Sequence, residues 1–157
     1  MECKRVIFPG SFDPFTRGHA AVVDEALRIF ESVVIGVGGN LSKRGLLPVG
    51  QREALIRDLY AGNPRVEVCT YDSLTGDFAR ECGASVIVRG VRSGYDIEYE
   101  QNMAAVNRRL YPDLTTVILC TPVEVSHISS SVVRELLAFG HDVSEFMPAG
   151  IDINDYL

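Results

Sequence analysis

Short runs of β-branched and other apolar residues alternate with helix-like segments along the whole sequence, and this alternation limits the folds open to it. The runs expected to form strands are 6–8, 33–37, 66–71, 86–88 and 116–119. The segments expected to form helices are 19–30, 51–60, 75–82, 96–111 and 130–139, with a short helical tail over about 143–157. The strands are apolar without alternation, which is typical of a parallel sheet that helices cover on both faces.

Five strand–helix units in a row predict a doubly wound α/β fold with a five-stranded parallel sheet, of the Rossmann-like type. The chain has 157 residues and no linker, low-complexity tract or internal repeat, so we expect one domain over residues 1–157. In folds of this class, ligands bind beyond the carboxyl ends of the strands, near the point where the strand order reverses. Functional residues are therefore expected in the loops that follow the strands.

The composition argues against several classes of protein. A net charge of −6 disfavours a general nucleic-acid binder, which needs a positively charged face. No apolar stretch is long enough to cross a bilayer and the first residues hold no apolar signal-peptide core, so we expect a cytoplasmic protein without a membrane partner. The four cysteines are scattered without a Cys-x-x-Cys pair, which favours reduced thiols over a zinc site.

The most familiar motifs of nucleotide enzymes on this fold are absent from the sequence. Residues 36–41 read Gly-Val-Gly-Gly-Asn-Leu, which begins like a dinucleotide-binding Gly-x-Gly-x-x-Gly motif but ends in leucine and follows the second strand. There is no Gly-x-x-x-x-Gly-Lys-Ser/Thr motif and no Gly-x-Ser-x-Gly motif. Hydride transfer, Walker-type hydrolysis of nucleoside triphosphates and serine hydrolysis are therefore disfavoured.

The loop after the first strand has the composition of a phosphate-binding site. Residues 9–19 read Pro-Gly-Ser-Phe-Asp-Pro-Phe-Thr-Arg-Gly-His, which combines a rigid turn, two glycines and a histidine at the start of a helix. Gly10 and Gly18 allow the backbone to approach a ligand, and the free N–H groups of a helix N-terminus attract an anion. A lone histidine at a helix start is more often only structural. Here His19 closes a dense motif at the ligand-binding edge of the sheet, which favours a role in binding phosphate.

Other cationic and hydroxyl side chains are predicted at the same edge. Arg89 and Arg92 follow the fourth strand, and arginine forks match the oxygens of phosphate groups. Residues 129–131 are three serines before the last main helix, which we expect them to cap while they also contact phosphate. Lys43 and Arg44 follow the second strand; outside this context they would be interpreted as part of an ordinary solvated loop.

With these residues in view, the loop at 9–19 resembles the Thr/His-x-Gly-His motif of the nucleotidyltransferase superfamily. Thr16 in the first motif position resembles the phosphopantetheine adenylyltransferase family in particular. Later segments extend the resemblance in order over nearly the whole chain, namely Ser-Lys-Arg at 42–44, Arg-Gly-Val-Arg at 89–92 with Asp-Ile-Glu-Tyr-Glu at 96–100, and Ile-Ser-Ser-Ser at 128–131. Each segment alone is a weak signal, whereas the four in order are specific.

The resemblance implies an enzyme that transfers AMP from ATP to 4′-phosphopantetheine, giving dephospho-coenzyme A and pyrophosphate. The catalytic residues that it implies are His19, Lys43 and Arg92. The residues that it implies for binding phosphopantetheine are Ser11, Lys43, Thr75 and Arg89. Those that it implies for binding ATP are Ser11, Phe12, His19, Gly90, Val91, Arg92, Glu100, Val125, Ser126, His127, Ile128, Ser129, Ser130 and Ser131.

A mechanism and partners also follow from the resemblance. A phosphate oxygen of phosphopantetheine attacks the α-phosphorus of ATP in line, and the protein contributes positioning and electrostatic stabilisation. We expect Mg²⁺ to accompany ATP, held by phosphates and water, and we predict no protein metal ligands. Asp96 and Glu100 share a helix face while Glu98 points elsewhere, so no three-carboxylate site is expected. A homohexamer and feedback binding of coenzyme A are implied by the resemblance alone.

The sequence departs from the family pattern at a few positions. Ser11 stands where threonine is more usual and keeps the hydroxyl, while Val125 and His127 stand where many members carry aromatic side chains. Two other interpretations stay open. The first is a transferase of the same superfamily that acts on nicotinamide mononucleotide or an alcohol phosphate, against which Thr16 and the segment 96–100 argue. The second is a non-catalytic nucleotide-binding module, which the retained cationic and serine residues disfavour.

Overall fold

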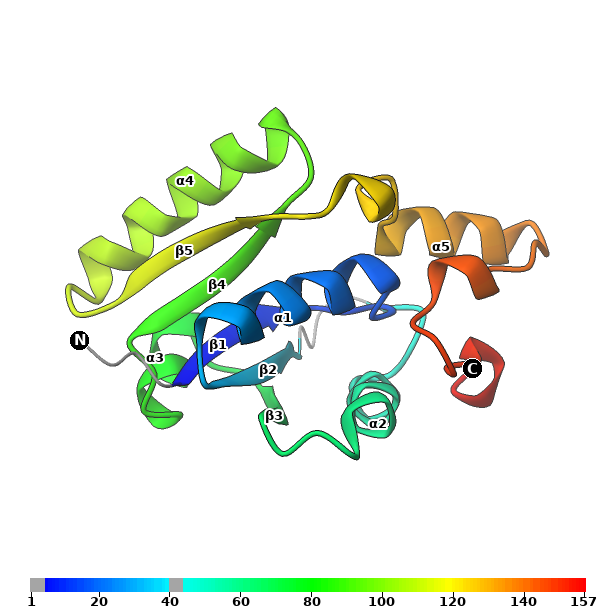
Figure 1. The fold of residues 1–157 in the computed structure, drawn as a ribbon, viewed down its shortest axis with the longest axis horizontal. Helices are drawn as coiled ribbons and strands as arrows, with labels where there is room; N and C mark the ends of the chain where they lie inside the picture. The colour runs from blue at the N-terminus through cyan, green and yellow to red at the C-terminus, as the bar shows by residue number, and fades with distance from the viewer. Residues whose placement is uncertain (1–4, 40–43) are drawn as a thin grey trace.

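A five-stranded parallel sheet forms the centre of the protein in a computed structural model that describes residues 5–39 and 44–157 (Figure 1). The strands lie in the order β3-β2-β1-β4-β5. Their bounds are β1 Arg5–Gly10, β2 Ser32–Gly38, β3 Val66–Tyr71, β4 Val86–Val91 and β5 Thr115–Cys120. All the pairings are parallel, which confirms the predicted doubly wound α/β fold.

Helices connect successive strands, as the alternating sequence pattern predicts (Figure 1). Their bounds are α1 Arg17–Ile29, α2 Val49–Tyr60, α3 Thr75–Glu81, α4 Gly94–Leu110 and α5 Ser130–Ala138. Three short 3₁₀ turns follow β5, namely η1 Val123–Val125, η2 Ser144–Phe146 and η3 Ile153–Asp155. None of the helices in the described part of the chain is long and apolar enough to cross a membrane.

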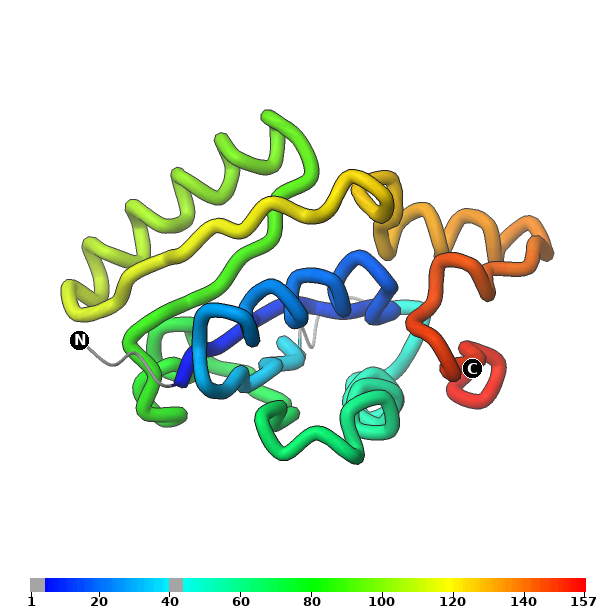
Figure 2. Tube along the Cα trace, viewed as in Figure 1, coloured from blue at the N-terminus to red at the C-terminus, as the bar shows by residue number. Residues whose placement is uncertain are grey.

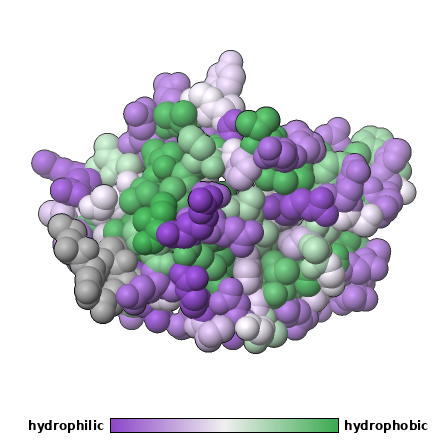
Figure 3. All heavy atoms as spheres, in the orientation of Figure 1, coloured by the Kyte–Doolittle hydropathy of each residue, from purple (hydrophilic) through white to green (hydrophobic). Residues whose placement is uncertain are grey.

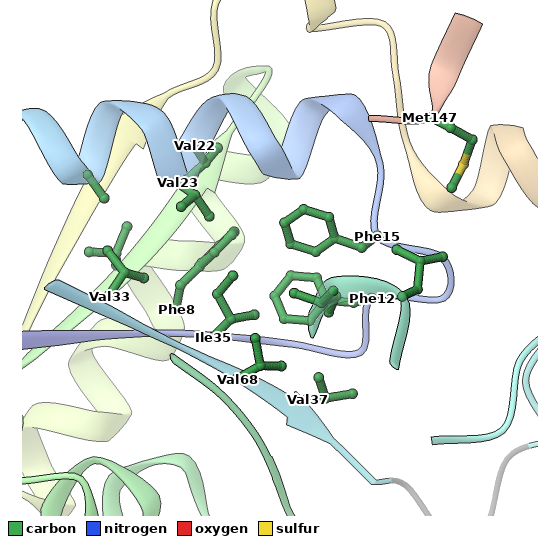
Figure 4. Packing of buried hydrophobic residues seen from close by; sticks show 14 of the residues in the cluster. Phe8, Phe12, Phe15, Val22, Val23, Val33, Ile35, Val37, Val68 and Met147 are labelled. Atoms are coloured by element: carbon green, nitrogen blue, oxygen red, sulfur yellow. The ribbon is translucent and has the colours of Figure 1, made fainter. Parts of the chain in front are cut away.

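Alternate side chains of each central strand enter different hydrophobic layers. Val6 and Phe8 of β1 pack in the larger layer with residues of α1, α2 and the C-terminal tail. Ile7 points to the opposite face, where it packs with residues of α3 and with Tyr111. Figure 4 shows how Phe12 and Phe15, from the loop after β1, fill the larger layer between α1 and the sheet. The core therefore extends up to the loop that carries the phosphate-binding motif.

The prediction of a helix over 143–157 is wrong. The C-terminal tail instead contains the short 3₁₀ turns η2 and η3. Gly140 ends α5 with a φ of +75°, in the left-handed region that favours glycine. The carboxylates of Asp142 and Asp152 then accept hydrogen bonds from backbone N–H groups two residues further on, at Ser144 and Asn154. Such local turns compete with a continuous helix. The tail nevertheless folds back onto the body of the protein, as Figure 2 shows, and the Tyr156 hydroxyl donates to Asp58 of α2.

The strand order reverses between β1 and β4, which lie side by side although β2 and β3 separate them in sequence. Strand β1 continues through Pro9 and Gly10, beyond its predicted end, because both residues remain in register with β2. On the other side, β1 aligns Ile7 with Ile87 of β4. Ligands of open α/β sheets bind at such a reversal. The loops after β1 and β4 are therefore brought together where the functional site is expected.

One glycine allows α1 to approach the sheet at this point. A Cβ atom added to Gly90 of β4 would lie 2.6 Å from Cγ2 of Val22, a buried residue of α1. We expect Gly90→Ala to lower the free energy of unfolding by about 1–3 kcal/mol, because the extra methyl group overpacks the contact. The control is Gly62→Ala, since a Cβ atom there meets nothing within 4 Å. Chemical denaturation of both variants checks this, and equal stabilities would contradict it.

Candidate active site

A cleft of about 310 Å³ opens at the carboxyl ends of β1 and β4. It is bounded by the loop after β1, the first turns of α1, the end of β4 and the start of α5. The predicted site residues that line it are Ser11, Phe12, His19, Arg89, Gly90, Arg92, Ile128, Ser129, Ser130 and Ser131. The structure thus brings together residues that lie more than a hundred positions apart in the sequence.

The side chain of His19 is held by the residue that begins its helix. Thr16 is the N-cap of α1, and its backbone N–H donates to Nδ1 of His19 over 2.9 Å. A backbone N–H only donates, so Nδ1 is the acceptor and the proton of the neutral ring resides on Nε2. The ring takes the place of the glutamate or glutamine of an ordinary capping box. His19 therefore presents an N–H donor to the cleft.

Three aromatic rings pack around the imidazole and remove part of its surface from water. The ring centroids of Phe12 and Phe15 lie 5.1 Å and 5.3 Å from that of His19, and Phe8 lies 6.4 Å away. This burial, with the nearby charges of Arg89 and Arg92, lowers the pKa of His19 from 6.5 to about 4. The histidine is therefore neutral near pH 7 and acts as a hydrogen-bond donor, not as a cation.

Arg89 stands at the centre of the site and is fixed by a buried carboxylate. Its Nε and Nη2 atoms donate to the two oxygens of Glu100 over 2.8 Å each, and Nη1 donates to the Pro9 carbonyl over 2.6 Å. Glu100 is 6% exposed. Two of the five N–H groups of the guanidinium stay available for a ligand. Glu100 therefore orients Arg89; it lines a smaller hollow next to the cleft, and its contact with ATP stays a prediction.

The start of α5 provides the opposite wall of the cleft. Ser129 is the N-cap of α5, and its hydroxyl accepts a hydrogen bond from the Val132 N–H over 3.2 Å. The Ser130 hydroxyl donates to the Pro14 carbonyl over 2.8 Å, which joins this helix to the loop after β1. Free N–H groups at such a helix N-terminus attract phosphate. Across the cleft lies Arg92, whose backbone N–H donates to Asp96.

Two further hollows meet the cleft at Arg89. One, of about 460 Å³, is lined by Gly10, Ser11, Gly38 and Gly39 together with residues 71–75. The other, of about 170 Å³, lies between Thr75 and α4. Thr75 and Arg89 line both hollows, and Arg89 also lines the cleft. The space on either side of Arg89 can thus hold two parts of a ligand, or two ligands that react with each other.

Some predicted site residues lie elsewhere. Val91 is 4% exposed and belongs to the core, because side chains of β4 alternate between the sheet faces. Val125, Ser126 and His127 do not line the cleft. The backbone of this turn comes near α1, since a Cβ atom on Gly18 would lie 3.7 Å from the Val125 carbonyl oxygen. Lys43 lies outside the described residues.

One cation at the cleft was not predicted from the sequence. Arg134 of α5 lines it, and its guanidinium donates to the Asp13 carbonyl over 2.7 Å and to the Ser131 hydroxyl over 3.2 Å. The spacing of Arg134 was a usable signal. Arg134 lies four positions beyond Ser130 and three beyond Ser131, and residues at these spacings share a helix face. Within residues 5–39 and 44–157, no cluster of three histidine, cysteine or acidic residues is placed to hold a metal ion.

Comparison with known proteins defines the class first. Residues 7–136 match the family model described as cytidylyltransferase-like. The fold is shared with a bifunctional NMN adenylyltransferase/ADP ribose pyrophosphatase from Francisella tularensis, with a TM-score of 0.70 at 17% sequence identity. That similarity covers 92% of this chain and 44% of the other. Fold and site thus define a nucleotidyltransferase-type domain.

Relatives of closer sequence narrow the class to one family. The phosphopantetheine adenylyltransferase of Porphyromonas gingivalis is 51% identical over 150 residues, covering 96% of this chain and 97% of the relative. The enzymes of that name from Phocaeicola vulgatus and Bacteroides thetaiotaomicron are 49% and 46% identical, each covering 96% of this chain and 99% of the relative. The chain belongs to the phosphopantetheine adenylyltransferase family.

The environment of His19 leads to a test by pH. Because its pKa in the folded protein is about 4 against 6.5 ordinarily, the unfolded chain binds more protons between these values. Stability should therefore fall as the pH drops from 6.5 towards 4. In His19→Gln, whose side chain can preserve the capping box, this part of the pH dependence should be lost. Urea denaturation at several pH values measures it, and identical slopes for both proteins would contradict it.

Proposed function

We propose that this protein transfers AMP from ATP to 4′-phosphopantetheine, giving dephospho-coenzyme A and pyrophosphate. The observation that carries the proposal is the meeting of the cleft and the two hollows at one oriented guanidinium, Arg89. The nucleotide occupies the cleft between the loop after β1 and the start of α5. The acceptor occupies the hollows lined by Thr75, with its phosphate next to Arg89 and Ser11. The names of the close relatives support the same reaction.

The proposed reaction is a direct displacement. An anionic oxygen of the acceptor phosphate forms a bond to the α-phosphorus of ATP, while the bond from that phosphorus to the bridging oxygen breaks. Pyrophosphate leaves with the electron pair, and no base has to remove a proton, because the attacking phosphate is already an anion near neutral pH. The residues that would hold the phosphates are His19, Arg89, Arg92 and the serines at the start of α5. Catalysis then comes from positioning and preorganised donors.

The neutral state of His19 suits this role. Its Nε2–H is a fixed donor, since Thr16 occupies Nδ1. Such a preorganised donor stabilises the charge that develops on the α-phosphate oxygens without any reorganisation. We further propose that Lys43, which the resemblance places among the catalytic residues, contacts the same phosphates. Val125, Ser126 and His127 would reach the adenine through their backbone, because η1 lies against α1 beside the cleft.

Magnesium is proposed to enter with ATP. The described residues offer no cluster of acidic side chains for it, so the ion would be held by phosphate oxygens and water. It would neutralise part of the charge on the pyrophosphate as it leaves. Coenzyme A shares both its pantetheine part and its adenine with the proposed ligands, so we propose that it binds in the same place and inhibits. We also propose that the protein acts in the cytoplasm.

The reaction is tested by pyrophosphate release with ATP, Mg²⁺ and 4′-phosphopantetheine. We expect release that depends on phosphopantetheine, with dephospho-coenzyme A identified by mass spectrometry. Nicotinamide mononucleotide as acceptor and CTP as nucleotide serve as controls. Pyrophosphate release only with one of these controls would overturn the proposed substrates. No release with any combination would favour a non-catalytic nucleotide-binding module.

The role of His19 is tested in the same assay. His19→Ala should lower kcat by roughly 10²–10³-fold, because one preorganised donor is lost. His141→Ala is the control, since His141 is exposed and does not line the cleft. Thermal unfolding shows whether each variant is folded. Turnover of folded His19→Ala within a few-fold of the wild type would mean that His19 is not a catalytic donor.

We propose a homohexamer, and α4 offers the surface that supports it. The exposed apolar side chains along one stripe of this helix are Tyr95, Tyr99, Met103, Val106 and Leu110, which are between 39% and 89% exposed; Tyr99 and Met103 also line the smaller hollow. They recur every three or four residues, as in the contact stripe of packed helices. Figure 3 shows hydrophobic side chains gathered on the side of the molecule that carries α4 and β5.

Light scattering tests this surface. The wild type is expected to have the mass of six copies, and Val106→Glu to reduce it, because a charge on the stripe opposes its burial. Val123→Glu is the matched control, since Val123 is 83% exposed but lies outside α4. A monomeric wild type, or the same mass for both variants, would contradict the proposal.

A further inference from the structure

Two side chains outside the proposed chemistry connect the segment between β2 and α2 to the loop after β1. One is Asp13, in that loop, and the other is Arg52, on α2. Neither lines the cleft or the two hollows next to it. Their hydrogen bonds nevertheless converge on the backbone that forms part of the walls of this site.

Asp13 holds the far end of the segment. Asp13 is 8% exposed. Its two carboxylate oxygens accept hydrogen bonds from the Leu46 N–H over 2.7 Å and the Leu47 N–H over 2.8 Å. Burial of a carboxylate is costly unless its charge is satisfied, and bonds to a charged acceptor are among the stronger ones. Two bonds from adjacent N–H groups fix both the distance and the orientation of this backbone.

The chain beside these N–H groups is adapted to the carboxylate. A Cβ atom added to Gly45 would lie 2.5 Å from Oδ2 of Asp13 and 3.2 Å from its Cγ. Carbon and oxygen atoms do not approach so closely without displacement. Only glycine therefore allows residues 45–47 to pass over Asp13 in this position.

Arg52 holds both ends of the same segment. Its Nη1 atom donates to the carbonyl of Gly38, the last residue of β2, over 3.2 Å and also to the carbonyl of Ser11. Its Nε atom donates to the carbonyl of Leu47, just before α2, over 3.1 Å. A single planar guanidinium thus joins the start and the end of the segment to the loop after β1.

The connected backbone forms part of the site. Gly38 and Gly39 line the larger hollow together with Ser11. On the other side, Arg134 of α5 donates to the carbonyl of Asp13, so the loop is held from the nucleotide side as well. In the sequence, Lys43 lies between the two anchored ends.

We propose that Asp13 and Arg52 are positioning residues that set the acceptor side of the site, by holding the flanks of the β2–α2 segment against the loop after β1. This inference rests on the proposed function. Displacement by about 1 Å is enough to lower a rate about 10²-fold. A loss of this network should therefore impair the use of the acceptor, while the nucleotide cleft keeps its own contacts with α5.

The first test is Asp13→Asn, which has nearly the same shape. Its NH₂ group would face a backbone N–H, so that one bond is lost and two donors oppose each other. We expect kcat/KM for 4′-phosphopantetheine to fall about 10²-fold. The dissociation constant of ATP, measured by calorimetry, should stay near that of the wild type. A merely structural role would lower the melting temperature without this split between acceptor and nucleotide.

A double-mutant cycle tests the contact itself and remains informative if one variant is unstable. Gly45→Ala should lower kcat/KM for the acceptor in the wild-type background, because its methyl group collides with Oδ2 of Asp13. In an Asp13→Ala background the collision is absent, so the same substitution should have little further effect. Additive effects would overturn the inference.

Arg52 provides the matched pair of variants. Arg52→Lys should act in the same direction as Asp13→Asn, since an ammonium group cannot reach three carbonyl oxygens in the fixed geometry of a guanidinium. Arg57→Lys is the control, because Arg57 lies on the same helix but donates to Glu53 and to the Val68 carbonyl.

The outcomes separate the two proposals. A wild type without acceptor-dependent pyrophosphate release would remove the proposed function and this inference with it. An active wild type with folded Asp13→Asn and Arg52→Lys variants of full acceptor efficiency would overturn the inference alone. Equal losses for acceptor and ATP would also overturn it, because they would indicate a general structural role.

Discussion

The hydrogen bond from the Thr16 N–H to Nδ1 of His19 is the interaction on which the geometry of the site depends. It begins α1 at the edge of the sheet, orients the imidazole, and leaves the proton of the neutral ring on Nε2. Desolvation by the aromatic rings around His19, together with the charges of Arg89 and Arg92, then keeps the ring neutral. The helix cap and the proposed catalytic donor are thus one structure, so neither changes without the other.

The arrangement of charge explains how an acidic protein binds anions. The chain has a net charge of −6, yet Arg89, Arg92 and Arg134 all border one cleft, beside the N-terminus of α5. Glu100 fixes Arg89 through two bonds, and its own burial is possible only because of that pair. Local placement of a few cations, and not the overall charge, therefore decides what the site attracts.

Much of the fold and part of the site could be predicted, and the misses have physical causes. The strand and helix patterns, together with the cap residues, were sufficient to predict the parallel sheet and the positions of His19 and Arg89 at its carboxyl edge. The contacts of Glu100 with Arg89 and of Asp13 with Leu46 and Leu47 were not predictable from local sequence, because they join segments that meet only in the folded chain. The predicted helix in the C-terminal tail does not form, because the side chains of Asp142 and Asp152 accept hydrogen bonds from nearby backbone N–H groups and stabilise local turns.

Helix α4 is 17 residues long but buries little of its surface. Glu100 is its one fully buried residue within the described part of the chain, and that residue is bonded to Arg89. An exposed apolar stripe runs along the same helix beside Glu100, and Tyr99 and Met103 of this stripe line the smaller hollow together with Glu100 and Arg89. In the proposed hexamer, one helix would thus contribute both to the contact between copies and to the orientation of Arg89. A neighbouring copy bound at this stripe would then lie next to the carboxylate that orients the guanidinium.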